Sequence, residues 1–125
     1  MLQLDSSGSS VILMIETADA LRNIESIAAV PGVDVLLIGA NDLSLELGIQ
    51  GQWDNVLFRE TLGTVANACR KENIVMGLAG LYNRPDICED AIKRLGVRYV
   101  LVNLDIGLVT AAAKTNVEML KTLEA

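Results

Sequence analysis

The sequence predicts an α/β fold of four successive strand–helix units whose strands pair in parallel. Short apolar runs rich in β-branched residues recur along the chain, and each is followed by apolar residues at helical spacing. Such runs are typical of strands that are covered on both faces. Right-handed crossovers would place the helices outside a parallel sheet. The pattern fits an open α/β sandwich or half of an eight-stranded barrel, and does not decide between them.

The first strand is predicted over Val11–Ile15, after a polar lead-in over residues 1–10 that we expect to be flexible. The helix that follows is expected from about Ala18 to Ala29. Thr17 is the expected N-cap, because a hydroxyl before an apolar-periodic run can accept a hydrogen bond from the first helical turn. Pro31-Gly32 is expected to end this unit.

The second strand is predicted over Val33–Ile38. A loop over Gly39–Ser44 is expected next, with an irregular stretch up to Asp54, because glycine and asparagine are common turn residues. The second helix is expected from about Asn55 to Glu72. Four residues at helical spacing predict its buried face, namely Phe58, Leu62, Val65 and Cys69.

The third strand is predicted over Ile74–Leu78, and its helix begins near Pro85, a favoured first helical position, and ends at Gly96. Its inward residues are expected to be Ile87, Ala91, Ile92 and Leu95. The fourth strand is predicted over Arg98–Val102, and the last helix from about Gly107 to Thr122.

Composition narrows the class of protein. The chain has 125 residues, which suits one domain over residues 11–125. Hydrophobic residues make up 51% and the mean hydropathy is +0.40, which predicts a sheet covered on both faces or an apolar surface for a partner. The net charge of −6 without a basic stripe argues against nucleic acid. No apolar run approaches the ~20 residues of a membrane span.

The N-terminal residues resemble no signal peptide, since they have neither a basic region nor an apolar core. The two cysteines, Cys69 and Cys88, fall on separate predicted helices, and we expect free thiols in a reducing, cytoplasmic compartment. The chain contains no histidine, which excludes Ser-His-Asp chemistry, Cys-His chemistry and any histidine-ligated zinc within this chain.

Two carboxylates follow two predicted strands. Glu16 closes the first apolar run and Asp42 follows the second. Active sites of parallel α/β folds lie outside the carboxyl ends of their strands. Two carboxylates there suit Mg²⁺ or Mn²⁺, with water and substrate oxygens as further ligands. The alternative is that each carboxylate caps the helix after its strand.

The turn Gly39-Ala40-Asn41-Asp42 is the strongest local signal for a binding site. Gly39 permits close approach of the backbone to a ligand. The N–H groups of Asn41 and Asp42 would bind a carboxylate, and a neighbouring metal would polarise a keto group. Together they suit a 2-oxo acid such as pyruvate, whereas the alternative is an ordinary loop. Two weaker candidates are Asp105, better suited to helix capping, and Gly77–Gly80, better suited to packing and turn geometry.

These motifs resemble the HpcH/HpaI aldolase family of class II metal-dependent pyruvate aldolases, in the phosphoenolpyruvate/pyruvate superfamily. The resemblance rests on Met14-Ile15-Glu16-Thr17 and on Ile38-Gly39-Ala40-Asn41-Asp42-Leu43-Ser44. It continues through Met76-Gly77 and Val102-Asn103-Leu104-Asp105, and so extends over nearly the whole chain from Val11.

The resemblance implies that the chain forms the second half of a (β/α)8 TIM barrel. It implies Glu16 and Asp42 as ligands of Mg²⁺ or Mn²⁺, and Gly39, Asn41 and Asp42 as the pyruvate-binding residues. The implied reaction is reversible cleavage of a 4-hydroxy-2-oxo acid to pyruvate and an aldehyde. The implied partners are other copies in a homo-oligomer, often through exchange of the final helix, or a complementing first half of the barrel.

The chain departs from the family pattern in three respects. Met14 stands where many members have a glutamine that contacts substrate, and the loop reads Gly39-Ala40-Asn41-Asp42 instead of Gly-Pro-Ala-Asp. The family's arginine that stabilises the enolate and its proton-transferring histidine have no counterparts here, so no catalytic residue is assigned. Two alternatives to an aldolase stay open: a non-catalytic remnant or assembly module that keeps the metal and pyruvate turn, and an open flavodoxin-like module.

Overall fold

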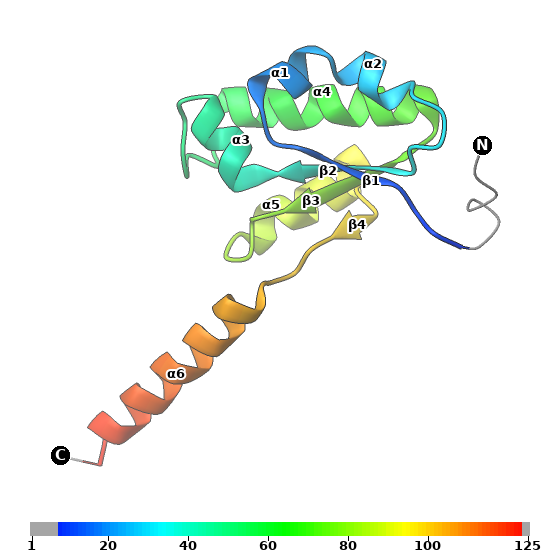
Figure 1. Cartoon of the computed structure of the whole chain (residues 1–125). Helices are drawn as coiled ribbons and strands as arrows, with labels where there is room; N and C mark the ends of the chain where they lie inside the picture. Colours follow the sequence, from blue (N-terminus) through cyan, green and yellow to red (C-terminus); the bar gives the residue numbers. More distant parts are fainter. Residues whose placement is uncertain (1–7, 124–125) are drawn as a thin grey trace.

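The computed structural model describes residues 8–123, so most of the expected lead-in over residues 1–10 lies outside the described residues. Four parallel strands form one sheet in the order β1-β2-β3-β4 (Figure 1). Each strand pairs with the next one along the chain, whereas a flavodoxin-like sheet places its first strand between the second and third. The flavodoxin-like alternative is therefore wrong. The strand bounds are β1 Ile12–Ile15, β2 Val35–Gly39, β3 Val75–Ala79 and β4 Tyr99–Val100.

Strand β2 is the centre of the sheet. It pairs with β1 from Ile12↔Val35 to Ile15↔Ile38, and with β3 as far as Gly39↔Ala79. All five of its residues are buried, which agrees with the apolar run in the sequence. This double pairing brings the carboxyl ends of β1, β2 and β3 to one edge of the sheet.

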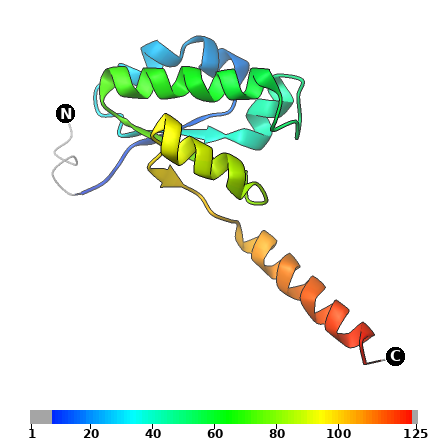
Figure 2. The same cartoon turned by 180° about the vertical axis from the view of Figure 1, so that it is seen from behind.

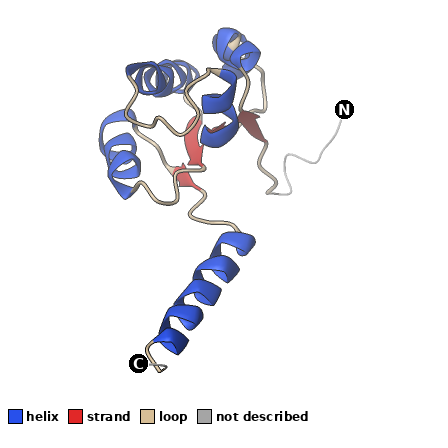
Figure 3. Ribbon diagram, turned by 90° about the vertical axis from the view of Figure 1, so that its left-hand side faces the viewer, coloured by secondary structure: helices blue, strands red, loops and turns tan. Residues whose placement is uncertain are grey.

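The two faces of the sheet are covered differently. Ile15, Ile38 and Leu78 point to the helix-covered face and belong to the main hydrophobic core. The helices α1, α2, α4 and α5 are arranged in an arc on this side of the strands (Figure 3). On the opposite face Ile12 and Met14 are 38% and 48% exposed. That face therefore lacks part of the cover that the high hydrophobic content predicts.

The first helical segment differs from the expected single helix over Ala18–Ala29. It is divided into α1 Ala18–Arg22 and α2 Ile24–Ala28. The Asn23 side chain donates a hydrogen bond to the Asp19 carbonyl at 2.9 Å, and so competes with the helical backbone pattern. Thr17 is the N-cap of α1 as predicted, because its hydroxyl accepts a hydrogen bond from the Ala20 N–H at 3.1 Å.

The expected loop over Gly39–Ser44 is wrong, because helix α3 spans Ala40–Glu46. Burial of Ala40 and Leu43 against the core stabilises a helix that turn propensity alone did not predict. The Ser44 hydroxyl donates to the Asn41 carbonyl at 2.9 Å and stabilises the first turn. Asp42 consequently lies within a helix.

Helix α4 spans Val56–Glu72 and confirms the second predicted helix. The Asn55 side chain caps it by accepting from the Leu57 N–H at 3.0 Å. The chain leaves it through Asn73 in the left-handed conformation, a common helix ending. All four predicted inward residues are buried, namely Phe58, Leu62, Val65 and Cys69.

The third helix consists of α5 Pro85–Asp90 and a π-helical turn, η2 Ala91–Leu95, and it ends at Gly96 as predicted. The wider turn changes the helical register, and Ile92 is 42% exposed instead of inward. Strand β4 has only two residues instead of the predicted Arg98–Val102. It is an edge strand that pairs with β3 alone, and the chain leaves the sheet after Val100.

The last helix, α6 Asp105–Lys121, buries none of its residues. It extends away from the sheet in both views of the whole chain (Figures 1 and 2). Its exposed large apolar residues are Ile106, Leu108, Val109, Val117, Met119 and Leu120. Within residues 8–123, no helix combines the length and the apolar character needed to cross a bilayer.

Both cysteines are free thiols, as predicted. Burial raises the pKa of the Cys69 thiol to about 11, and burial also raises the pKa of Cys88, which is less deeply buried. Because the thiolate is the reactive form, we expect Cys88 to react with a disulfide reagent much faster than Cys69 at pH 8. Time-resolved labelling of Cys69→Ala and Cys88→Ala variants tests this order, and faster labelling of Cys69 would contradict it.

Candidate functional site

A cleft of about 190 Å³ lies at the carboxyl ends of the strands. The predicted substrate-binding residues Gly39, Asn41 and Asp42 all line it, from the end of β2 and the start of α3. Its other lining residues come from β1, the start of α3, the end of β3 and the segments after β3 and β4, namely Met14, Ala40, Ala79, Gly80, Tyr82, Leu101 and Leu104. The structure therefore brings the predicted binding turn to the edge where parallel α/β folds place their sites.

Glu16 lies against Gly39. A Cβ built on Gly39 would be 3.2 Å from the Glu16 Cβ, 3.3 Å from its Oε2 and 3.4 Å from the Met14 Sδ. The absence of a side chain at this position thus leaves space for the Glu16 carboxylate beside the end of β2. Glu16 does not itself line the cleft, but its carboxylate contacts a residue that does.

Neither carboxylate caps a helix through a side-chain hydrogen bond, although Asp42 lies in the first turn of α3, where a negative charge is favourable. Thr17 caps α1, and Gly39 stands at the N-cap of α3. Across residues 8–123, neither the Glu16 nor the Asp42 carboxylate takes part in a side-chain hydrogen bond or ion pair. Both are available as oxygen ligands. No group of three or more potential metal-binding side chains occurs in this part of the chain, so water and substrate would complete any coordination shell.

Gly80 lies in the loop after β3, next to Asn41 at the start of α3. It has φ of +88°, and a Cβ there would lie 2.9 Å from the Asn41 Nδ2 and 3.3 Å from the Asn41 backbone N. Gly80 thus combines a left-handed backbone with a close approach, as only glycine does without strain. Gly77 contacts Leu37 and Tyr99 inside the sheet, in agreement with the packing role expected there.

Sequence reasoning missed the apolar wall of the cleft. Tyr82, Leu101 and Leu104 line it, and the sequence alone assigns no role to Tyr82. The available signal was its position, three residues after the end of β3 and hence near the carboxyl edge. Asp105, the weaker third carboxylate, accepts a hydrogen bond from the adjacent Ile106 N–H at 2.7 Å, but Leu104 is the N-cap of α6 and no side chain caps this helix, so the expected capping by Asp105 is wrong.

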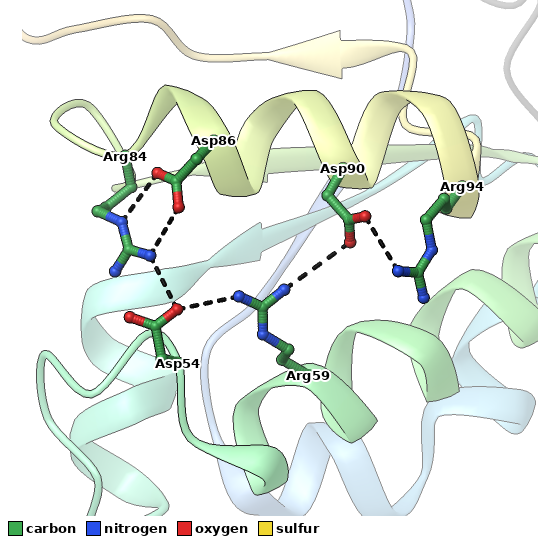
Figure 4. Close-up of polar contacts among 6 residues, drawn as sticks. All are labelled: Asp54, Arg59, Arg84, Asp86, Asp90 and Arg94. Carbon is green, nitrogen blue, oxygen red and sulfur yellow. Dashed lines mark hydrogen bonds and ion pairs between the residues drawn. The ribbon is translucent and has the colours of Figure 1, made fainter.

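Alternating charges connect two loops beside the cleft (Figure 4). The Arg84 guanidinium, at the start of α5, contacts Asp54 at 2.9 Å and Asp86 at 2.7 Å. Asp54, in the loop between α3 and α4, also pairs with Arg59 at 3.0 Å. The network continues along α4 and α5 to Asp90 and Arg94. It joins the segment after α3 to the segment after β3, both of which lead from cleft residues.

The network changes the acidity of its carboxylates. The Arg84 guanidinium lowers the pKa of Asp86 to about 2, and Arg84 and Arg59 together lower the pKa of Asp54. Asp86 and Asp54 in turn raise the pKa of Arg84. A carboxylate with a depressed pKa favours the folded state above its ordinary pKa, and the contribution is lost as the pH falls towards the lowered value.

The structure defines an α/β protein whose parallel sheet brings Glu16 and Asp42 to its carboxyl edge. Comparison with known proteins identifies its family. Residues 5–112 match the profile of the HpcH/HpaI aldolase/citrate lyase family. The chain belongs to that family.

Two fungal relatives are named 4-hydroxy-4-methyl-2-oxoglutarate aldolases. The chain is 48% identical over 109 residues to the enzyme of Chaetomium globosum and 44% identical over 109 residues to that of Hapsidospora irregularis. Each match covers 87% of this chain and 40% of the relative, so the chain spans about two fifths of their length. The HpcH/HpaI aldolase of Desulfitobacterium hafniense superimposes with a TM-score of 0.74 at 27% identity, covering 90% of this chain and 42% of that one.

Arg84→Met removes the central cation of the network, and we expect its destabilising effect to depend on pH. The loss in melting temperature should be larger at pH 6, where Asp54 and Asp86 are ionised, and should shrink as the pH falls from about 4 towards 2. Thermal unfolding of both proteins across this range tests the expectation. Arg22→Met, which breaks the ion pair with Asp19 within α1, is the control, and an Arg84→Met effect that does not change with pH would refute the expectation.

Proposed function

We propose that this chain is part of a metal-dependent carbon–carbon lyase that cleaves a 4-hydroxy-2-oxo acid to pyruvate and an aldehyde. The observation that carries the proposal is the Glu16 carboxylate held against Gly39, at the edge of the cleft lined by Asp42. Membership of the HpcH/HpaI family supports the reaction class. The names of the two fungal relatives support a substrate with a second carboxylate.

Glu16 and Asp42 would hold a divalent cation. Their carboxylate oxygens are the ligands that Mg²⁺ and Mn²⁺ prefer, and within the described residues no cation or N–H group competes for them. When bound, such a cation supplies Lewis-acid stabilisation of the charge that develops on the keto oxygen. Substitution of either carboxylate by its amide would remove the charge that attracts the cation.

The remaining cleft residues would bind and shield the substrate. The backbone N–H groups of Asn41 and Asp42, in the first turn of α3, lack partners within that helix and can donate to the carboxylate of pyruvate. Gly80 keeps a side chain away from the Asn41 N–H. Leu101 and Leu104 would exclude water, and Met14 supplies only a thioether where many family members have a glutamine.

The second candidate is a binding or assembly module without turnover. The observation in its favour is the absence of any histidine, because the chain then has no imidazole to transfer a proton near neutral pH. In this alternative the chain binds metal and pyruvate but does not cleave substrate. A catalytic role then needs a proton-transferring group other than imidazole, or one from another subunit.

We further propose that the four strands are the second half of a (β/α)8 barrel and that the chain associates with copies of itself or with a first half. The consecutive strand order and the arc of helices on one face support this arrangement. An apolar hollow of about 230 Å³ beside β3 and α5 remains open, lined by residues such as Leu78, Pro85 and Val102. Helix α6 carries a matching exposed apolar surface.

Metal and pyruvate binding tests the proposed function. Mn²⁺ with pyruvate should stabilise the fold by about 2.7 kcal/mol at a hundredfold excess over Kd, measured by thermal or urea unfolding. Glu16→Gln and Asp42→Asn should each abolish the stabilisation. Glu46→Gln is the matched control, since it removes an exposed carboxylate from α3 outside the cleft. Retention of the full effect in both site variants would refute the assignment.

Association through α6 is tested by light scattering. We expect the chain to be larger than a monomer, and Val109→Glu/Val117→Glu to shift it towards the monomer, because burial of these residues would drive association. The fold should persist, since α6 buries no residue against the rest of the protomer. Thr115→Glu/Thr122→Glu adds the same charge at a polar position of α6 and at its C-cap, and should leave the assembly unchanged. A monodisperse monomer before substitution would overturn the proposal.

A further inference from the structure

A second, polar cleft borders the candidate active site on the side of α6. It has a volume of about 390 Å³ and lies between the loop after β3 and the first half of α6. Tyr82 lines both clefts. The segment after β4 also joins them, because Leu101 and Leu104 line the first cleft and Asn103 lines the second. Nothing in the proposed lyase chemistry uses this polar cleft.

The polar cleft is lined by hydrogen-bond donors, by a single charge and by the apolar side chains of Ile106 and Ala111. Lys114 is its one charged lining residue, and Asn83 and Thr110 add an amide and a hydroxyl. Lys71, Lys93 and Lys121 are each held by a glutamate. Within residues 8–123, Lys114 forms no ion pair, and no hydrogen bond involves the side chains of Asn83 or Thr110.

These features select an anion. The chain has a net charge of −6, so an unpaired lysine among neutral donors is a local exception to a repulsive surface. A carboxylate accepts several hydrogen bonds at once, and pairs well with an ammonium group and neutral donors. A phosphate would share this chemistry, but the continuity with a 2-oxo acid cleft favours a carboxylate on the same molecule.

We propose that the polar cleft binds the distal carboxylate of a dicarboxylic 2-oxo acid whose keto end occupies the candidate active site. This inference rests on the proposed function. It adds the polar cleft as the binding site that selects substrates with a second carboxylate. Lys114 is the specificity-determining residue. Tyr82 lies between the two clefts, and the ligand passes it to reach the polar cleft. A short monocarboxylate such as pyruvate ends before the polar cleft and makes no contact with Lys114.

The experiment compares two ligands and three variants. The affinities of the full chain for 2-oxoglutarate and for pyruvate, each with Mn²⁺, are measured by isothermal titration calorimetry. Lys114→Met should weaken 2-oxoglutarate binding about two- to fivefold, the range for an exposed charged pair, and leave pyruvate binding unchanged. Lys114→Arg should retain most of the affinity. Lys121→Met removes a lysine from the same helix outside the polar cleft and should change neither affinity.

The outcomes separate the two proposals. Pyruvate binding with an unchanged 2-oxoglutarate affinity in Lys114→Met overturns the distal-carboxylate site and leaves the proposed function intact. An equal loss for both ligands also overturns it, because Lys114 then affects the fold or the shared keto end. If the unsubstituted chain binds neither ligand, the proposed function fails, and this inference fails with it. Circular dichroism of each variant confirms that α6 and the sheet are retained.

Discussion

The pairing of β2 with both of its neighbours is the constraint on which the rest of the structure depends. Parallel pairing aligns the carboxyl ends of β1, β2 and β3, and the register carries Gly39 to the same edge as Ala79. The chain can therefore present Glu16, the first turn of α3 and the loop after β3 around one cleft, although these segments are far apart in the sequence. Displacement of β2 by one residue would turn its buried side chains to the opposite face and disrupt the cleft.

Two glycines determine the shape of this edge of the sheet. Gly39 leaves space for the Glu16 carboxylate, and Gly80 lets the loop after β3 approach Asn41. The ion-pair network lies outside the cleft lining. In it, Arg84 and Asp54 connect the segments that follow those glycines. Individual exposed ion pairs contribute little to stability, but a network across two loops restricts how those loops move relative to each other. Stability at the cleft thus comes from close backbone approach first and from surface charge second.

Much of the fold and part of the site could be predicted from the sequence. The apolar runs identified all four strands, and the helical spacing of Phe58, Leu62, Val65 and Cys69 identified the buried face of α4, because burial dominates in both cases. Helix α3 was missed because the glycine and asparagine of Gly39–Ser44 favour a turn locally, whereas burial of Ala40 and Leu43 in the core stabilises the helix. The π-helical turn at Ala91–Leu95 likewise has no periodic signature. The role proposed for Glu16 and Asp42 follows from their positions after strands, whereas the position of Tyr82 in the cleft lining depends on the folded loop.

The isolation of α6 has a consequence for how the chain behaves in dilute solution. A helix of 17 residues with no buried face has only its own backbone hydrogen bonds and local pairs, such as Lys121 with Glu118, to hold it. Helices of this length are marginal in water without packing. The helix content of the C-terminal segment should therefore rise with protein concentration, as association supplies the missing contacts, while the sheet stays folded throughout. Folding of this protein then has two steps. The sheet around β2 folds within one chain, and α6 becomes fully ordered only when two chains associate.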